Sequence, residues 1–200
     1  MISVPPGRSL VLASSSPRRR ELLTGAGLSF VIRPANIDET PLDGETPTAY
    51  VRRLSIEKAA ASAISPLSSA AEVIIAADTT VEISGDILEK PLDDDDAARM
   101  LRRLSGCSHS AHTAVTISIS RDGARRSTTI LVTTEVTFVA LTDEMIDWYL
   151  ATGEANGKAG AYGIQGAAGA FVERVNGSVT NVIGLPLAET LAALGIALAT

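Results

Sequence analysis

The stretch from residue 10 to residue 23, LVLASSSPRRRELL, constrains the fold of this chain more than any other. An apolar run suited to a buried strand (9–14) ends in three serines, and a proline then opens an expected helix (17–24) with three arginines in its first turn. Serine is favoured at a helix N-cap and proline at the first helical position, so the pattern predicts strand, turn and helix in direct succession. Such a succession is typical of an α/β protein.

The arginines in the first turn of this helix have two interpretations. Cations are disfavoured at a helix N-terminus, because the macrodipole is already positive there and backbone N–H groups point outward unpaired. Arg18 and Arg19 are then either plainly solvated beside an ordinary N-cap at Ser16, or placed to receive an anion, for which phosphate is well suited. The segment alone leaves both interpretations open.

Composition limits the class of protein. The chain has 200 residues, an apolar share of 46%, a mean hydropathy of +0.22 and a net charge of −6. These values predict a compact globular protein of one α/β domain or two small lobes, and they argue against nucleic acid as a partner. Apolar stretches are too short for a membrane span, the N-terminus is a poor signal peptide, and the single cysteine, Cys107, fits a reducing compartment. We therefore expect a cytoplasmic protein.

Positive charge is carried almost entirely by arginine. Fourteen arginines stand against three lysines, Lys58, Lys90 and Lys158. A chain that meets its general need for positive surface with arginine has a use for lysine where a compact point charge is required and a planar guanidinium does not fit. The three lysines are therefore candidates for a functional site, with chance as the alternative.

The order of the elements predicts a mixed sheet, because strands and helices alternate early in the chain while hairpins dominate its middle. Turns at 84–86 and 122–123 are expected to join hairpins, residues 171–175 and 179–183 to form a last hairpin, and the glycine-rich residues 153–169 to be irregular. The other expected strands are 9–14, 29–33, 72–77, 113–120 and 128–139. The expected helices are 17–24, 48–64, 94–104, 142–150 and 186–198.

Asp78 is placed for chemistry. It ends the fully apolar strand at 72–77, and α/β proteins place ligands at the rim where such strands end. Its carboxylate is suited to hold Mg²⁺ together with phosphate oxygens, or to act as a base toward a water, or merely to cap the following turn. The position by itself does not distinguish among these three roles.

Two other clusters have the composition of a metal site. Four consecutive aspartates (93–96) precede an expected helix, so they are interpreted as its acidic first turn. Cys107, His109 and His112 offer three zinc ligands, but no fourth ligand lies at a metal-like spacing, which favours a loop-to-strand junction instead. Neither cluster is predicted to bind a metal.

Seven segments, in this order and at these spacings, resemble the Maf family of nucleoside triphosphate pyrophosphatases. The resemblance begins at the serine–proline–arginine turn, runs nearly end to end, and includes all three lysines. The departures are small: Ser15 stands where glycine is common, and Thr80 where an aliphatic residue is usual. The segments are 13–19, 50–59, 77–79, 85–91, 104–115, 158–166 and 184–187.

This resemblance implies an α/β fold with a long curved mixed sheet flanked by helices, formed as one domain over residues 1–200 with two lobes and a deep cleft. It implies hydrolysis of a nucleoside triphosphate to the monophosphate and pyrophosphate by metal-assisted attack of water. Members are often dimeric, which leaves a homodimer open for this chain.

The resemblance also implies roles for individual residues. Asp78 accepts the proton of the attacking water, while Lys58 and Lys90 neutralise charge that develops on the leaving pyrophosphate. The residues implied to hold the polyphosphate are Ser14, Ser16, Arg18, Arg19 and Lys158.

The cofactor implied is a divalent cation, Mg²⁺ or Mn²⁺, held by Glu39 and Asp78. Glu39 is the less secure ligand, since its loop also contains Asp38, Asp43 and Glu45.

Three residues, Arg18, Thr79 and Gln165, match the branch of the family that is selective for dTTP and UTP. A glutamine amide offers a donor and an acceptor together, which complements the N3–H and carbonyl groups of uracil or thymine; alternatively, Gln165 only supports its loop. Two other functions stay open: a pyrophosphatase for modified or non-pyrimidine nucleotides, and a nucleotide-sensing regulator of cell division that binds without turnover.

Overall fold

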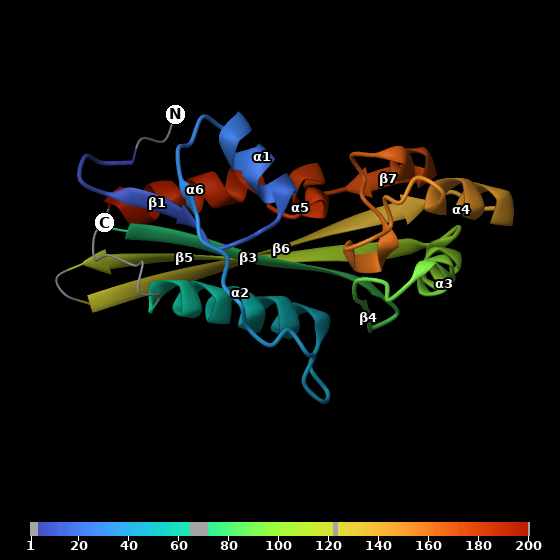
Figure 1. The fold of residues 1–200 in the computed structure, drawn as a ribbon, viewed down its shortest axis with the longest axis horizontal. Coiled ribbons are helices and arrows are strands. Elements are labelled where there is room, and N and C mark those ends of the chain that lie inside the picture. Colours follow the sequence, from blue (N-terminus) through green and yellow to red (C-terminus); the bar gives the residue numbers. More distant parts are fainter. Residues whose placement is uncertain (1–3, 65–71, 122–123, 200) are drawn as a thin grey trace.

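The centre of the molecule is a mixed sheet of seven strands (Figure 1). The computed structural model describes residues 4–64, 72–121 and 124–199. The strands are β1 (Ser9–Leu12), β2 (Val31–Ile32), β3 (Glu72–Ile83), β4 (Asp86–Leu88), β5 (Ser108–Arg121), β6 (Ala124–Phe138) and β7 (Val172–Asn176). Their order is β2-β1-β3-β5-β6-β7, with β4 paired to the far part of β3. β1 runs parallel to both of its neighbours, and the remaining pairs are antiparallel.

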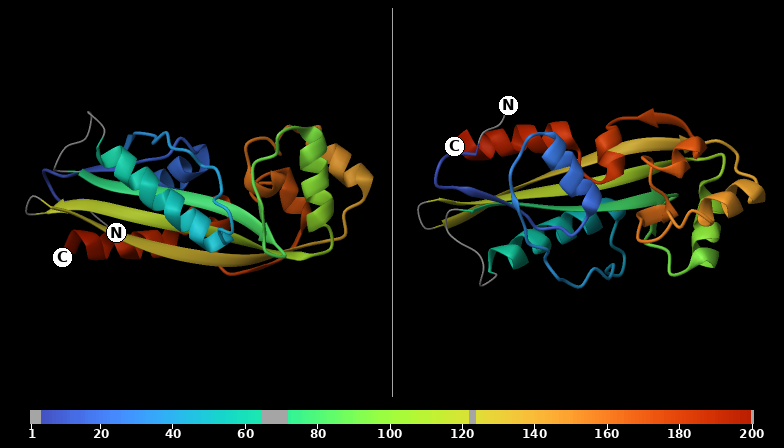
Figure 2. Two further views of the ribbon diagram at one scale, coloured as in Figure 1. Left: turned by 90° about the horizontal axis from the view of Figure 1, so that it is seen from below. Right: turned by 45° about the horizontal axis from the view of Figure 1, so that its top comes forward.

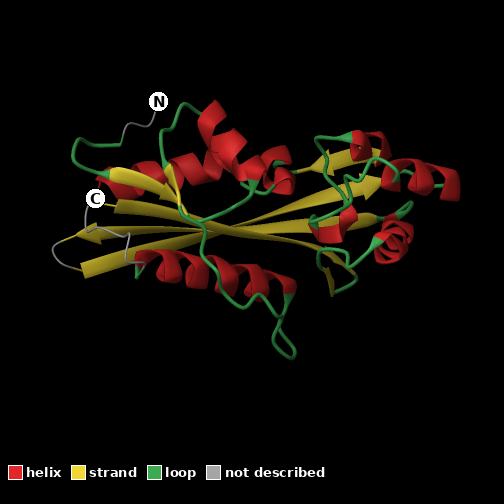
Figure 3. Cartoon of the chain, in the orientation of Figure 1, coloured by secondary structure: helices red, strands yellow, loops and turns green. Residues whose placement is uncertain are grey.

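One set of helices covers one end of this sheet and another set covers the other end, so the molecule has two lobes (Figure 2). They are α1 (Pro17–Gly25), α2 (Pro47–Ala63), α3 (Asp94–Leu104), α4 (Asp143–Leu150), α5 (Val179–Ile183) and α6 (Leu187–Ala199), with 3₁₀ helices η1 (Ala159–Ala161) and η2 (Ala167–Phe171). The first lobe has α1 and α6 on one face of the sheet and α2 on the other, whereas α3, α4, β4 and β7 belong to the second lobe (Figure 3). The expected fold, a long mixed α/β sheet flanked by helices, is confirmed. No helix in the described ranges is long and apolar enough to cross a bilayer.

Alternation along the strands explains how both faces of the sheet are buried in the first lobe. Successive side chains of a strand point to opposite faces. Leu12 and Ile75 therefore pack in one cluster with residues of α1 and α6, while Val11 and Ile74 pack in another with Ala59 of α2. This burial on both faces accounts for the continuous apolar runs that the sequence shows.

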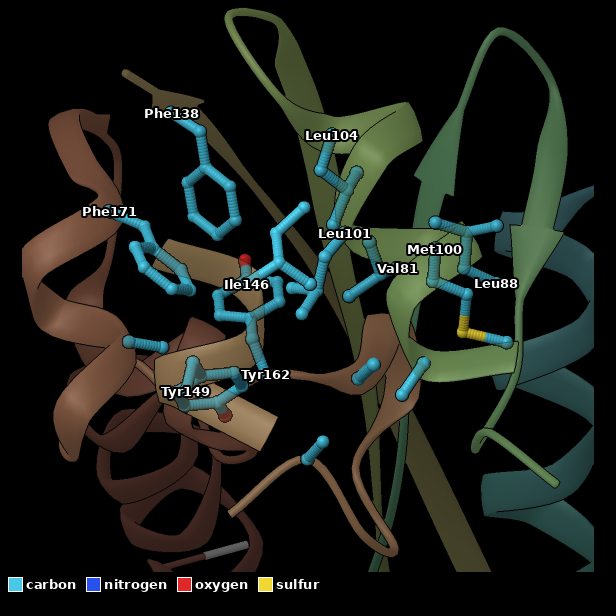
Figure 4. Close-up of a cluster of buried hydrophobic side chains, with 14 of the residues drawn as sticks. Val81, Leu88, Met100, Leu101, Leu104, Phe138, Ile146, Tyr149, Tyr162 and Phe171 are labelled. Atoms are coloured by element: carbon cyan, nitrogen blue, oxygen red, sulfur yellow. The ribbon is translucent and has the colours of Figure 1, made fainter. Parts of the chain in front are cut away.

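The second lobe is held by an aromatic cluster (Figure 4). Phe138 of β6 stacks edge to face on Tyr162, with ring centroids 4.8 Å apart, and Phe171 packs in the same way on Tyr149 of α4 at 5.2 Å. Such pairs add stability beyond the area that they bury. The glycine-rich segment around Tyr162 is thereby fixed to the end of the sheet.

β3 is longer than the sequence predicts. It continues through Asp78 to Ile83, because β5 pairs with it in unbroken register and places Ala114 opposite Asp78. The prediction that the strand ends at Asp78 is therefore wrong, and the carboxylate caps no turn.

Residues 179–183 form helix α5, so the predicted last hairpin is wrong. The β-branched residues of this segment favoured a strand, but the Ser178 side chain caps the helix by accepting from Asn181 N at 3.2 Å. The buried Asn181 side chain then donates to Ala111 O at 2.9 Å and ties the helix to the sheet. β7 pairs with β6 instead, and the turn expected at 122–123 lies outside the described residues.

The two clusters with the composition of a metal site lie in the local structure that the sequence predicts, a helix start and a loop-to-strand junction. The Asp93 side chain caps α3 by accepting from Asp96 N at 2.8 Å, which makes the aspartate run its acidic first turn. Cys107 is exposed just before β5, while His109 and His112 lie within that strand and bond to other side chains. Among the described residues, no group of three or more histidine, cysteine or acidic side chains is placed to hold a metal.

Candidate active site

A cleft of about 630 Å³ lies between the two lobes. It opens where one edge of β3 loses its strand partner, since β1 pairs with β3 as far as Ile75 and β4 pairs with it from Val81 onward. Between these two pairings, no other described strand pairs with this edge of β3. Asp78, Thr79 and Thr80 therefore line the cleft from the middle of a strand.

All three lysines of the chain line this cleft. Lys58 comes from α2, Lys90 from the segment after β4, and Lys158 from the loop before η1. Three elements that are distant in the sequence thus direct the few lysines of an arginine-rich chain to one place, which favours a functional interpretation over chance.

Arg19 forms part of the floor of the cleft rather than an exposed surface. Ser16 caps α1 and Pro17 opens it, as predicted. However, Arg19 is only 9% exposed, and its guanidinium donates to Ser14 Oγ at 3.1 Å and to Thr79 Oγ1 at 3.0 Å. Burial lowers the pKa of Arg19, and the nearby carboxylate of Asp78 opposes that effect. The interpretation that this arginine is simply solvated is wrong.

Arg18 and Lys158 add two half-buried cations to the cleft. Arg18 Nε, on the side of the first lobe, donates to Ile183 O at 3.3 Å. Lys158 lies on the side of the second lobe, where its Nζ donates to Glu154 O of the same segment. The Lys158 stem lies over Gly163, where a Cβ would come within 2.8 Å of its Cε. Burial lowers the pKa of both groups, and each of these cations increases the demand of the site for an anion.

Lys58 joins two carboxylates at the centre of the cleft. Its Nζ lies 2.6 Å from Asp78 Oδ1 and 2.6 Å from Glu39 Oε1. Burial raises the pKa of the Asp78 carboxyl, while the charges of Lys58 and Arg19 oppose the rise. Burial acts in the same direction on Glu39, but the hydrogen bonds and charges of Lys58 and Lys90 outweigh it and lower the pKa of that carboxyl.

The structure distinguishes Glu39 from the other acidic residues of its loop. Asp38 is exposed and accepts locally from Thr40, and Glu45 pairs with Arg53 at 2.7 Å. Glu39 instead lines the cleft. Its backbone carbonyl accepts from the hydroxyl of Tyr50 on α2 at 2.9 Å.

Lys90 and Gln165 lie at the rim of the cleft. Lys90 Nζ is 3.3 Å from Glu39 Oε2, and the lysine side chain is 63% exposed. Gln165 is exposed and lines the cleft from the second lobe. Both side chains therefore have room to move toward a ligand.

Sequence reasoning missed three residues that line or support this site. Tyr50 and Thr113 lie within segments that resemble the Maf family, but no role was attached to either. Thr113 of β5 is fully buried and lies 2.8 Å, Oγ1 to Oγ1, from Thr79. Asn181 was assigned to a strand, and no signal in the sequence marked it.

The mixed sheet flanked by helices defines an α/β protein, and its cleft gathers arginines and lysines around a pair of carboxylates, an arrangement that suits a highly charged anion. Comparison with known sequences specifies it further: the chain belongs to the Maf family, since the family model described as Maf-like protein matches residues 9–196.

Several proteins are similar to this chain over most of its length. A protein of Anaeromyxobacter dehalogenans (strain 2CP-1) is 53% identical over 185 residues, which cover 92% of each chain. A protein of Hahella chejuensis is 48% identical over 95% of this chain and 92% of its own, and one of Myxococcus xanthus is 47% identical over 92% and 90%. All three are named dTTP/UTP pyrophosphatase.

Proposed function

We propose that this protein hydrolyses dTTP and UTP to the monophosphate and pyrophosphate. The names of its relatives support this activity. The observation that carries the proposal is the contact of one buried ammonium, Lys58, with two carboxylates in the same cleft as a buried arginine. A triphosphate needs cations for its charge, and its hydrolysis needs a base for the water.

The cations of the first lobe are proposed to hold the phosphates. Arg18 and Arg19 lie in the first turn of α1, whose first N–H groups and positive dipole end also favour an anion. Ser14 and Ser16 stand in the same turn, where Ser14 Oγ already orients the Arg19 guanidinium. Lys158 reaches the cleft from the opposite side.

Asp78 is proposed to take the proton from the attacking water. The water oxygen bonds to the α-phosphorus, and the bond from that phosphorus to the bridging oxygen breaks as pyrophosphate leaves. A buried carboxyl with a raised pKa is a stronger base than one in water, and Lys58 helps to keep it ionised. Lys58 and Lys90 neutralise charge that builds up on the pyrophosphate.

Glu39 and Asp78 are proposed to hold Mg²⁺ or Mn²⁺. Their oxygens converge on the same Lys58 nitrogen, and one or two carboxylates plus phosphate oxygens are the ligands that Mg²⁺ usually takes. When bound, such a cation polarises phosphoryl oxygens and shields their charge. The donor set of the cleft therefore fits the cofactor.

Selection of the base is proposed to depend on Arg18, Thr79 and Gln165, all of which line the cleft. The Thr79 hydroxyl is hydrogen-bonded within the protein, whereas Gln165 is exposed in the cleft and able to turn its amide toward a base. Pairing with N3–H and a carbonyl of uracil or thymine would leave a cytosine or purine with mismatched groups.

Pyrophosphate release over a panel of nucleotides with Mg²⁺ tests the proposal. We expect dTTP and UTP to have the highest kcat/KM. Faster release from GTP or from a modified nucleotide would replace the substrate and keep the reaction, while binding without release would indicate a sensor. Cytoplasmic location, a homodimer and the lack of nucleic-acid partners stay predictions.

A further inference from the structure

Arg19 is fixed by acceptors from three parts of the fold. Its Nε donates to Gly184 O at 2.8 Å, Nη1 to Ser14 Oγ at 3.1 Å and Nη2 to Thr79 Oγ1 at 3.0 Å. A guanidinium has five N–H groups, so these three bonds leave two that donate to no described residue. The acceptors that hold the first three also set the direction of the remaining two.

The hydroxyl of Thr79 is ordered by Thr113. Thr113 Oγ1 donates its single proton to Asn181 O at 3.1 Å, because a carbonyl can only accept. The 2.8 Å contact between the two threonine oxygens then needs the proton of Thr79. Thr79 Oγ1 is left as an acceptor for Arg19. Gly184 O also lies 3.3 Å from Thr79 Oγ1. If Thr79 donated there and Thr113 donated to Thr79, the shorter contact of Thr113 Oγ1 with Asn181 O, 3.1 Å, would be left without a proton, so this arrangement is the less favourable one.

Asn181 fixes the other end of this chain of hydrogen bonds. Its side chain is fully buried and donates to Ala111 O of β5 at 2.9 Å and to Thr134 Oγ1 of β6 at 3.0 Å. The short helix α5, which lies beside α1, is thereby tied to two strands (Figure 1). The carbonyls at its end, Ile183 O and Gly184 O, are the acceptors of Arg18 and Arg19.

We propose that Thr113 and Asn181 are positioning residues for the arginines of the phosphate site. Thr113 fixes the lone pair that Thr79 offers to Arg19, and Asn181 fixes the end of α5 that holds both guanidinium groups. Neither residue lines the cleft, so each acts through others. The inference rests on the proposed function only for the nature of the ligand, a nucleoside triphosphate.

Thr113→Val tests this role, because it removes the hydroxyl and keeps the shape of the side chain. The proton of Thr79 then has only Gly184 O left as acceptor, which already holds Arg19 Nε. We expect the KM for dTTP and the Kd for inorganic tripolyphosphate, measured by calorimetry, to rise about tenfold with little change in kcat. Thr113→Ser restores the hydroxyl and should restore both constants.

Thr116→Val is the matched control. Thr116 is equally buried on the same strand, and its hydroxyl contacts Ser55 and Thr129 rather than the arginine network. It should lower the melting temperature as Thr113→Val does and leave KM and Kd unchanged. Should Thr113→Val not fold, Thr113→Ala removes the same hydroxyl with more space.

The outcomes separate this inference from the proposed function. The positioning role would be overturned if KM for dTTP and Kd for tripolyphosphate were the same in Thr113→Val and Thr116→Val, or if Thr113→Ser did not restore them. Either result would leave the proposed hydrolysis intact. A wild-type protein that binds tripolyphosphate but releases no pyrophosphate from dTTP would overturn the hydrolysis, while the Kd series would still decide the role of Thr113. A wild-type protein that neither binds tripolyphosphate nor releases pyrophosphate from dTTP would overturn both.

Discussion

Lys58 and Asp78 form a buried ion pair, with Nζ and Oδ1 2.6 Å apart, between α2 and the middle of β3. Buried charges are costly unless they are paired, and removal of one partner leaves the other uncompensated. Here the lysine has a second carboxylate, Glu39, at the same distance. Substitution of Asp78 therefore leaves Lys58 paired, and chemistry can be tested apart from folding.

Asp78→Asn should abolish turnover while the protein stays folded. The amide keeps the shape of the side chain and cannot take a proton from water, and loss of a general base costs about 10²- to 10⁴-fold in rate. Pyrophosphate release at saturating dTTP with Mg²⁺, together with the melting temperature, checks this. Near-normal turnover with an unchanged melting temperature would remove Asp78 from the mechanism.

Lys58→Arg should reduce kcat/KM by about a hundredfold, because a guanidinium does not fit where an ammonium lies 2.6 Å from two carboxylates. The scarcity of lysine in the sequence predicts such a loss for Lys90→Arg. The structure limits it to Lys58, which is 9% exposed, whereas Lys90 is 63% exposed and has room for the larger head group. Lys90→Arg should therefore lose less activity, and equal losses in the two variants would contradict this argument.

Glu39→Gln should raise the Mg²⁺ concentration needed for half-maximal activity by about tenfold, since one of two charged ligands becomes neutral. Asp38→Asn is the control, because this carboxylate lies in the same loop and, among the residues that the structure describes, forms its hydrogen bonds with Thr40 alone. Titration of activity with Mg²⁺ separates the two variants. If Glu39→Gln needed no more Mg²⁺ than Asp38→Asn, Glu39 would not be a metal ligand.

Gln165→Glu should lower kcat/KM for UTP about ten- to hundredfold, since a mismatched pair costs about 1–3 kcal/mol. The carboxylate has no N–H to donate to a uracil carbonyl. Inhibition by inorganic pyrophosphate reports on the phosphate contacts and should change much less. If the variant lost affinity for pyrophosphate in proportion to its loss of kcat/KM for UTP, Gln165 would be assigned to the phosphates rather than to the base.

His109 should make the folded state sensitive to acid. Burial lowers the pKa of this histidine to about 4, and its Nε2 is hydrogen-bonded to the hydroxyl of Tyr162 at 2.9 Å. The unfolded chain, with an ordinary pKa of about 6.5, binds the proton first, so stability present above pH 6.5 is lost as the pH falls toward 4, by about 3 kcal/mol. Urea unfolding at a series of pH values checks this. His109→Gln should flatten the slope in that window, and an unchanged slope would assign the acid sensitivity to other groups.

Local signals in the sequence predicted the parts of the fold that local chemistry determines. The turn into α1 depends on Ser16 and Pro17, and the start of α3 on Asp93, so each could be predicted without knowledge of the rest of the chain. Pairing over long distances determines the parts that were missed. Asp78 follows an apolar run and resembles a strand end, but β5 pairs straight through it.

In the candidate site, too, local signals identified some residues while contacts between distant parts of the chain determine the others. Composition singled out the lysines and the strand pattern singled out Asp78, yet only resemblance to a family brought Glu39 to them. The contacts that join Thr113 and Asn181 to Arg19 involve residues up to 165 positions apart and buried hydroxyl directions. No periodicity or spacing encodes such contacts, so they emerge only from the folded chain.

The continuity of β3, β5 and β6 has a consequence for how the molecule handles its ligand. Residues 73–82 of β3 face residues 119–110 of β5 without a register shift, from one lobe into the other. Two bodies joined by a linker swing apart easily, but rotation here would shear the backbone ladder of three strands. The continuous sheet therefore fixes the width of the cleft and with it the size of substrate that can enter. We expect only the loops that carry Glu39 and Gln165 to move when a substrate binds.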